Sequence, residues 1–217
     1  MAAMQTELLK SDALGRIEIV IDGDRRWIRR DTSAARFGMR WFARGAAARE
    51  ARALQALAGV NGVPQLLGWA DGVLDRTYMG GAPMQQARPN DPGYYRRAHE
   101  LLKRIRRSGV VNNDLAKEPN WLQRDGGDPG VVDFQLAWVS LRRGPLFRLL
   151  AREDLRHLLK HKRTYCPQAM TPVELRVVRR RSWISRIWLA TGKKLYKLIA
   201  RKMFGYWDNE GQGRVRR

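Results

Sequence analysis

The sequence has little of several features that would place a chain in other classes. Cys166 is the one cysteine among 217 residues, which excludes an internal disulfide and is typical of a reducing compartment. No apolar run approaches the roughly twenty residues that a membrane-spanning helix needs, and Met1–Lys10 shows no secretory signal. We therefore expect a cytoplasmic protein.

Acidic residues are also scarce relative to basic ones. Against 42 Lys and Arg there are 21 Asp and Glu, which gives a net charge of +21 and a pI near 11.2. Most of the excess lies from Leu141 onward. Such a charge implies an anionic partner: nucleic acid, an acidic membrane face or a phosphorylated substrate. The hydrophobic fraction of 44% is enough for a core, so we expect one domain, or two small lobes that share a cleft.

Hydrophobic periodicity predicts a mixed α+β chain. Alternation in Gly15–Thr32 predicts a β-hairpin, and a second strand pair is expected between Gly62 and Met79. Apolar residues at helical spacing predict helices over Ala46–Leu57 and Tyr94–Arg107, with a basic, aromatic linker at Ser33–Arg44. From Leu141 onward the pattern is helical and strongly basic.

The central stretch carries the chemistry. Asp114 follows a short apolar run, Asn120 lies six residues later, and Asp133 ends a second apolar run. The turn signal Asp125–Gly130 between them predicts a hairpin with one Asp before it and one at its exit. Two carboxylates and a carboxamide that converge there suit Mg²⁺, a hard cation that takes oxygen ligands and often holds phosphate.

The segments NDLAKEPNWL and VDFQLA in this stretch resemble the catalytic centre of the protein-kinase-like fold. It is most similar to a family of small bacterial kinases grouped with RIO kinases and with kinases of 3-deoxy-D-manno-octulosonic acid. The resemblance implies a bilobal fold, with a reduced N-lobe sheet at 1–80 and a mainly helical C-lobe at 81–217. It also implies ATP and Mg²⁺ as cofactors.

The resemblance also implies roles for single residues. Asp114 becomes the catalytic base, with Lys117 near the transferred phosphate. Asn120 and Asp133 become metal ligands. Glu50 resembles the glutamate that pairs with the nucleotide-binding lysine.

Nucleotide contacts are implied at two further places. Tyr78 and Met79 lie where the hinge backbone pairs with adenine. No lysine lies between Lys10 and Lys103, so the strand at 27–31 offers Glu50 only arginines as partners. Arg30 is the weakly favoured partner, with Arg29 as the alternative; Arg is not a neutral replacement for Lys.

Other positions depart from the kinase pattern. Gly15 stands alone where a glycine-rich loop is usual, Asn112 replaces a histidine, and Gln135 replaces the glycine of D-F-G. Asn120 follows the catalytic Asp by six residues rather than five, which matches the small bacterial family. Together these departures favour a slow enzyme or a pseudokinase.

Three functions remain open from the sequence. The first is a phosphotransferase that acts on a protein Ser/Thr or a lipopolysaccharide-type sugar. The second is a pseudokinase scaffold, held peripherally at the inner membrane face by a basic C-terminal helix that carries Trp183 and Trp188. The third is a nucleic-acid-binding protein, which only the charge suggests. His157 and His161 have metal-like spacing, but no third ligand lies near them, so we interpret them as ordinary helix residues.

Overall fold

A computed structural model describes residues 4–179 of the chain. Internal contacts divide the chain into two compact units, 1–175 and 176–217. The predicted lobe boundary near residue 80 is not tested by this division and stays a prediction. The basic C-terminal helix with Trp183 and Trp188 lies outside the described residues. Within them, no helix combines the length and the apolar character that crossing a bilayer requires.

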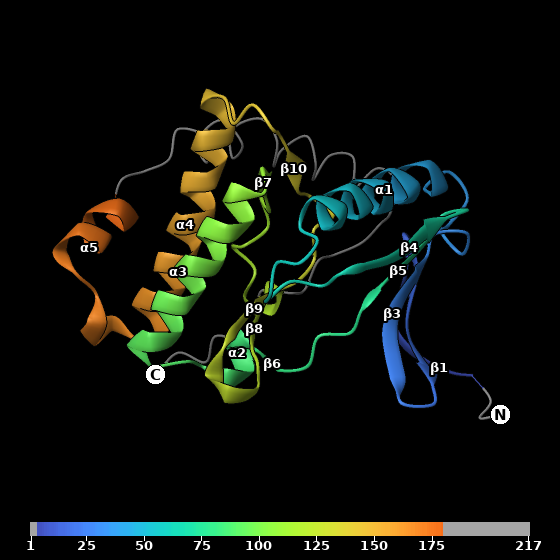
Figure 1. The fold of residues 1–217 in the computed structure, drawn as a ribbon, viewed down its shortest axis with the longest axis horizontal. Coiled ribbons are helices and arrows are strands. Elements are labelled where there is room, and N and C mark those ends of the chain that lie inside the picture. Colours follow the sequence, from blue (N-terminus) through green and yellow to red (C-terminus); the bar gives the residue numbers. More distant parts are fainter. Residues whose placement is uncertain (1–3, 180–217) are drawn as a thin grey trace. The chain divides into compact units, whose positions relative to one another are not determined.

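The first unit begins with a five-stranded antiparallel sheet (Figure 1). Its strands, in chain order, are β1 (Gln5–Asp12), β2 (Gly15–Asp22), β3 (Arg25–Asp31), β4 (Leu66–Ala70) and β5 (Val73–Thr77), and their spatial order is β1-β2-β3-β5-β4. Both predicted strand pairs are confirmed. β1 was not predicted, because all eight of its residues are exposed and their sequence carries no alternating pattern.

Helix α1 (Arg40–Ala56) packs against β4 and β5 (Figure 1). It buries small residues, including Ala43, Ala47 and Ala51, which lets the helix approach the strands closely. The predicted linker at Ser33–Arg44 is wrong in its second half, because the helix already begins at Arg40. Met39 provides no side-chain cap, so no capping signal marks this start.

The remainder of the unit is mainly helical. Asp91 caps α3 (Pro92–Arg107) by accepting hydrogen bonds from the N–H groups of Gly93 and Tyr94, and α3 packs against α4 (Pro145–Tyr165). The predicted helix at Tyr94–Arg107 is confirmed. The other elements of this unit are the helix α2 (Met84–Ala87) and the short strands β6 (Ala82–Pro83), β7 (Val110–Val111), β8 (Trp121–Gln123), β9 (Pro129–Val131) and β10 (Trp138–Val139), while α5 (Pro172–Arg179) crosses the boundary between the two units.

The predicted hairpin of the central stretch is also confirmed: β8 and β9 pair antiparallel, and the 3-10 turn Asp125–Gly127 joins them. β6 pairs with β8 on its other side, while β7 pairs with β10. The loop that carries Asp114 therefore leaves one small sheet at Val111 and enters the other at Trp121.

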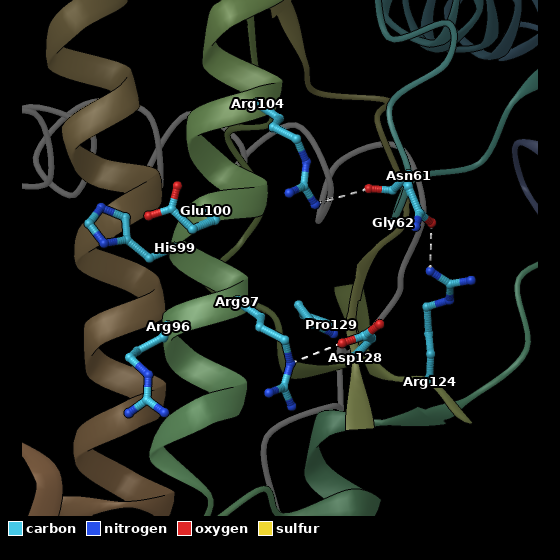
Figure 2. Close-up of a pocket in the computed structure, with 10 residues that line it drawn as sticks. All are labelled: Asn61, Gly62, Arg96, Arg97, His99, Glu100, Arg104, Arg124, Asp128 and Pro129. Atoms are coloured by element: carbon cyan, nitrogen blue, oxygen red, sulfur yellow. Dashed lines mark hydrogen bonds and ion pairs between the residues drawn. The ribbon is translucent and has the colours of Figure 1, made fainter. Parts of the chain in front are cut away.

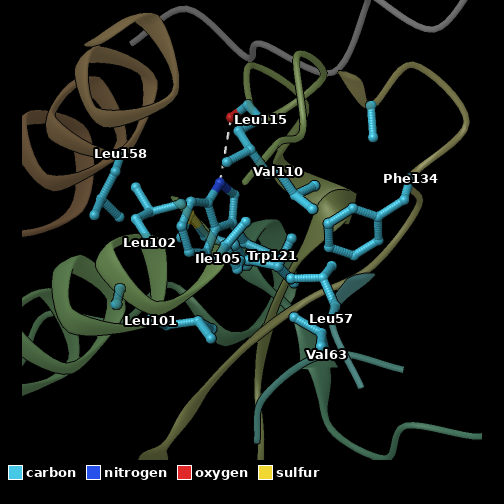
Figure 3. Close-up of a cluster of buried hydrophobic side chains, with 14 of the residues drawn as sticks. Leu57, Val63, Leu101, Leu102, Ile105, Val110, Leu115, Trp121, Phe134 and Leu158 are labelled. Atoms are coloured by element: carbon cyan, nitrogen blue, oxygen red, sulfur yellow. Dashed lines mark hydrogen bonds between the residues drawn. The ribbon is translucent and has the colours of Figure 1, made fainter. Parts of the chain in front are cut away.

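The hydrophobic core lies directly beneath this loop (Figure 3). Leu115, Trp121 and Phe134 are fully buried, and the Trp121 indole N–H donates to the Leu115 backbone oxygen at 3.2 Å. Each of these residues directly follows one of the candidate polar residues Asp114, Asn120 and Asp133. Burial of a large apolar side chain stabilises the fold by about 1.5–3 kcal/mol. The core therefore fixes the backbone that presents each polar group.

Candidate functional site

The backbone of the Asp114 loop is held from below by α4. Buried Asp154 accepts hydrogen bonds from the backbone N–H groups of Asn112, at 2.8 Å, and Asn113, at 3.1 Å. About two helical turns further along α4, His161 Nε2 lies 2.9 Å from the Leu115 backbone oxygen, and a hydrogen bond there requires the proton to be on Nε2. Two side chains of α4 thus fix the position of the loop backbone at Asn112, Asn113 and Leu115.

Asp114 lies at the centre of the site with its side chain only 14% exposed. One of its carboxylate oxygens, Oδ2, accepts from Asn120 Nδ2 at 3.1 Å and lies 3.1 Å from Lys117 Nζ. Burial raises the pKa of Asp114, and nearby Asp133 raises it further, whereas Lys117 and Asn120 act in the opposite direction. A carboxylate with a raised pKa is a better proton acceptor than an exposed one.

Asn112 joins the loop to the second carboxylate. Its Nδ2 donates to the backbone oxygen of Asp133 at 2.9 Å, and its Oδ1 accepts from the N–H of Asp114 at 3.0 Å. Asp133 has a φ of 62° and Asn113 a φ of 66°, both in the left-handed region that non-glycine residues seldom adopt. Each such residue costs about 1–3 kcal/mol, and such strain clusters at functional sites.

The candidate metal ligands form an oxygen-rich group. The Asn120 amide donates to the carboxylate and to the backbone oxygen of Asp114, and the Asp133 charge is near enough to raise the pKa of Asp114. Within residues 4–179, no cluster of three or more His, Cys, Asp and Glu side chains could hold a metal ion. Two carboxylates and an amide nevertheless fit Mg²⁺, which usually binds one or two protein carboxylates together with substrate phosphates.

Glu50 of α1 is fully buried beneath the five-stranded sheet, next to two arginines. Arg76 Nη1 lies 2.9 Å from Oε1, and Arg30 Nη1 lies 3.8 Å from Oε2. Neither carboxylate oxygen makes a well-aligned hydrogen bond with another described residue, so these contacts are ion pairs. Arg29 points away from this group and pairs with Asp75 through two hydrogen bonds, at 2.8 and 2.9 Å.

Solved structures with a similar architecture include two of the Rio2 kinase from Chaetomium thermophilum. One, a complex with ADP, Mg²⁺ and phosphoaspartate, has a TM-score of 0.57 and 16% identity, and the match covers 90% of this chain and 68% of that one. The second has a TM-score of 0.59 and 15% identity, with 81% of this chain and 62% of that chain covered.

The chain has a protein-kinase-like fold. The predicted fold class is thereby confirmed. No protein-family model and no curated protein matches the sequence. The likeness to kinases of 3-deoxy-D-manno-octulosonic acid and to small bacterial kinases stays a prediction.

Within this kinase-like fold, Tyr78 and Met79 follow β5 and lead to β6. The Arg26 guanidinium lies over the Tyr78 ring at 4.4 Å from its centroid. Met79 lies so close to Gly130 that a Cβ at Gly130 would come within 2.9 Å of the Met79 methyl group. This segment therefore contacts both the β2–β3 hairpin and the β8–β9 hairpin, and its role as a hinge remains a prediction.

The turn between β1 and β2 lies where kinases carry glycines. Gly15 has a φ of 119°, and a Cβ there would lie 2.1 Å from the Asp31 backbone oxygen, so only glycine fits. Its conformation is required by the close approach of β3.

A cavity of about 610 Å³ lies elsewhere, between α3 and the β8–β9 hairpin (Figure 2). Arg97 and Arg104 project into it from α3, while Arg124 and Asp128 project from the hairpin. None of the predicted site residues lines it. The carboxylates, the amide and the lysine of the Asp114 group lie outside this cavity.

Sequence reasoning missed three residues that shape the site. Arg76, the nearer partner of Glu50, lies in the short strand β5. The only sequence feature that could have identified it is its charge within a predicted strand. Asp154 gave no signal, because it lies in a helix rich in charged residues. His161, which had been interpreted as an ordinary helix residue, contacts the Asp114 loop.

Proposed function

We propose that this chain is an ATP- and Mg²⁺-dependent phosphotransferase. The observation that carries this proposal is the network in which Asn112 links the backbone of Asp114 to that of Asp133, while Asn120 donates to the Asp114 carboxylate. Carboxylates of like charge repel one another unless a cation or a proton lies between them. A site that collects two of them beside an amide and a lysine is suited to a metal and a phosphoryl group.

Asp114 would orient the acceptor hydroxyl and take its proton. The hydroxyl oxygen attacks the γ-phosphorus, the bond to the β-phosphate oxygen breaks, and ADP leaves. Asn120 and Asp133 would hold Mg²⁺, which neutralises phosphate charge when it is bound. Lys117, 3.1 Å from Asp114, would contact the transferred phosphoryl group.

Glu50 and its arginines would order the nucleotide from the sheet side, with the Tyr78–Met79 backbone against adenine. Arg30 is the better candidate for phosphate contact, because its 3.8 Å separation from Glu50 leaves the guanidinium more loosely held than that of Arg76. The acceptor would be a protein Ser/Thr or a lipopolysaccharide-type sugar hydroxyl.

The test is ATP turnover by Asp114→Asn. We expect a loss of about 10²–10⁴-fold, since general base catalysis contributes in this range. Asp125→Asn is the matched control, because Asp125 is exposed in the turn of the adjacent hairpin. Equal turnover by wild type and Asp114→Asn would reject the mechanism. No measurable turnover in the wild type would favour the pseudokinase alternative.

A second chemistry is suggested by the Rio2 kinase complex that contains phosphoaspartate. In this case a carboxylate oxygen of Asp114 or Asp133 attacks the γ-phosphorus and releases ADP, and water then cleaves the acyl phosphate. Labelling with γ-³²P-ATP followed by hydroxylamine distinguishes the two routes. An acyl phosphate on the protein is cleaved by hydroxylamine, whereas a phosphate ester of Ser, Thr or a sugar is stable.

A further inference from the structure

Two segments of the first unit contain arginines but no acidic residue on their exposed surfaces. Residues 36–49 carry four exposed arginines, and residues 136–152 carry four more. The exposed arginines are Arg36, Arg40, Arg44, Arg49, Arg142, Arg143, Arg148 and Arg152. We call these two segments together the apolar-basic surface.

The same segments expose most of the large hydrophobic side chains that the described residues leave in solvent. Trp41 and Leu141 are each 86% exposed, and Phe37 is fully exposed. The full set in the apolar-basic surface is Phe37, Trp41, Phe42, Leu136, Trp138, Leu141, Leu146 and Leu149. Exposed apolar side chains gathered in this way indicate a surface that is covered by a partner.

The two segments meet in space. Arg49 Nη1 of α1 donates to the Gln135 backbone oxygen at 3.4 Å, and α1 contacts β10. β10 pairs with β7, which in turn contacts α4. Figure 1 shows α1, β10 and the start of α4 along one edge of this unit. The exposed aromatic and leucine side chains therefore belong to one region of the first unit.

A cationic cavity of about 450 Å³ adjoins the second segment. Five of its six lining residues are basic and none is acidic: Lys103, Arg106, Arg107, Arg143, Arg148 and the buried Phe147. Lys103 is paired with Glu100, and Arg143 donates to the Arg107 backbone oxygen. The cavity also lies at the start of α4, where Gly144 provides no side-chain cap. A phosphate group fits this environment.

We propose that the apolar-basic surface binds an anionic membrane face, with leucine and aromatic side chains in the interface and lipid phosphates at the arginines. Interfacial surfaces combine these two features. Nucleic acid fits this surface less well, because four of the eight exposed side chains are leucines, which offer no stacking surface for bases. A second copy of the chain, or the strongly basic residues 180–217, would bring like charge to the surface.

The test is sedimentation of the full-length protein with vesicles of phosphatidylcholine alone, or with about one third phosphatidylglycerol. The test variant combines Trp41→Ser with Leu141→Ser. The matched control combines Leu8→Ser with Leu67→Ser, two leucines on the five-stranded sheet that are each 57% exposed. All four side chains are exposed, so thermal unfolding should be unchanged in both variants. Vesicle binding needs no nucleotide, so its outcome is independent of phosphotransfer.

We expect the test variant to bind the anionic vesicles about tenfold or more weakly than wild type, because each interfacial side chain buries apolar area. The control should bind like wild type. Arg142→Gln with Arg148→Gln should reduce the preference for anionic over neutral vesicles. Unchanged binding by the Trp41 and Leu141 variant would overturn the proposal and assign vesicle binding to another part of the chain. Loss of RNA binding in that variant, with vesicle binding intact, would assign the surface to nucleic acid.

Discussion

Glu50 shows what a single buried charge requires of its surroundings. Its carboxylate is fully buried, and Arg76 and Arg30 approach opposite oxygens. Taking a carboxylate out of water costs several kcal/mol, which paired charges offset only in part. Arg76, at 2.9 Å from Glu50, therefore offsets most of the free-energy cost of burying this carboxylate, and Arg30, at 3.8 Å, offsets less.

Substitutions should separate these two arginines. Arg76→Met leaves Glu50 with its distant partner alone, so we expect the free energy of unfolding to fall by about 3–5 kcal/mol. Arg30→Met should cost less stability and weaken ATP binding more. Urea denaturation and a nucleotide-binding titration of both variants measure the two effects.

Arg29→Met is the control for this comparison. Arg29 lies in β3 beside Arg30 but forms a partly exposed ion pair with Asp75 of β5. Its loss should therefore lower the free energy of unfolding by about 1 kcal/mol or less. If Arg30→Met and Arg76→Met proved equal in both stability and nucleotide affinity, the division of roles between them would be wrong.

At the scale of elements, α4 acts as the support of the Asp114 loop. Asp154 receives two backbone N–H groups of that loop, and burial nevertheless raises the pKa of its carboxyl to about 7. The folded state thus holds a proton that the unfolded chain, with an ordinary Asp pKa of about 3.9, has already released at pH 5 or 6. This carboxyl therefore contributes stability at low pH that is lost as pH rises from about 4 to about 7.

Asp154→Asn should abolish this pH dependence. The amide carries no titratable proton, so the variant should lose the fall in unfolding free energy that wild type shows between about pH 4 and 7. Its Nδ2 also faces a loop N–H that then has no acceptor, which costs about 1–3 kcal/mol. Urea denaturation at several pH values measures both. An identical pH slope in wild type and variant would mean that Asp154 is ionised in the folded protein throughout this range.

At the scale of the whole molecule, nucleotide binding should connect the Glu50 group to the Asp114 group. A ligand that binds only the folded state stabilises it by about 2.7 kcal/mol at one hundred times its Kd. For a protein of this size, we expect ATP with Mg²⁺ to raise Tm by about 5–10 °C. ATP without Mg²⁺ should raise it less, because Asn120 and Asp133 would then lack the cation that joins them to phosphate.

Asp133→Asn provides the control for the metal. It should remove the difference between ATP alone and ATP with Mg²⁺, while the ATP-only shift persists. A Tm that does not respond to ATP under either condition would contradict nucleotide binding. A full response in Asp133→Asn would remove Asp133 from the metal site.

The sequence by itself determined the features whose parts lie close along the chain. Asp114, Asn120 and Asp133 lie within twenty residues, and the turn residues of Asp125–Gly130 predict the turn between β8 and β9. The strands at Gly15–Asp22 and Arg25–Asp31 and the helix α3 were likewise readable, because their periodicity and turn residues act locally. The protein-kinase-like fold was predicted from the resemblance of the motifs NDLAKEPNWL and VDFQLA to the catalytic centre of kinases.

Only the tertiary structure decided how distant residues complete the site. Arg76 reaches Glu50 because β5 pairs with β3 beside α1, and Asp154 reaches Asn112 across 42 residues because α4 packs beneath β7. Neither residue differs from a surface charge in its local sequence. Which charges become buried and paired depends on packing between elements, and no local pattern records that packing.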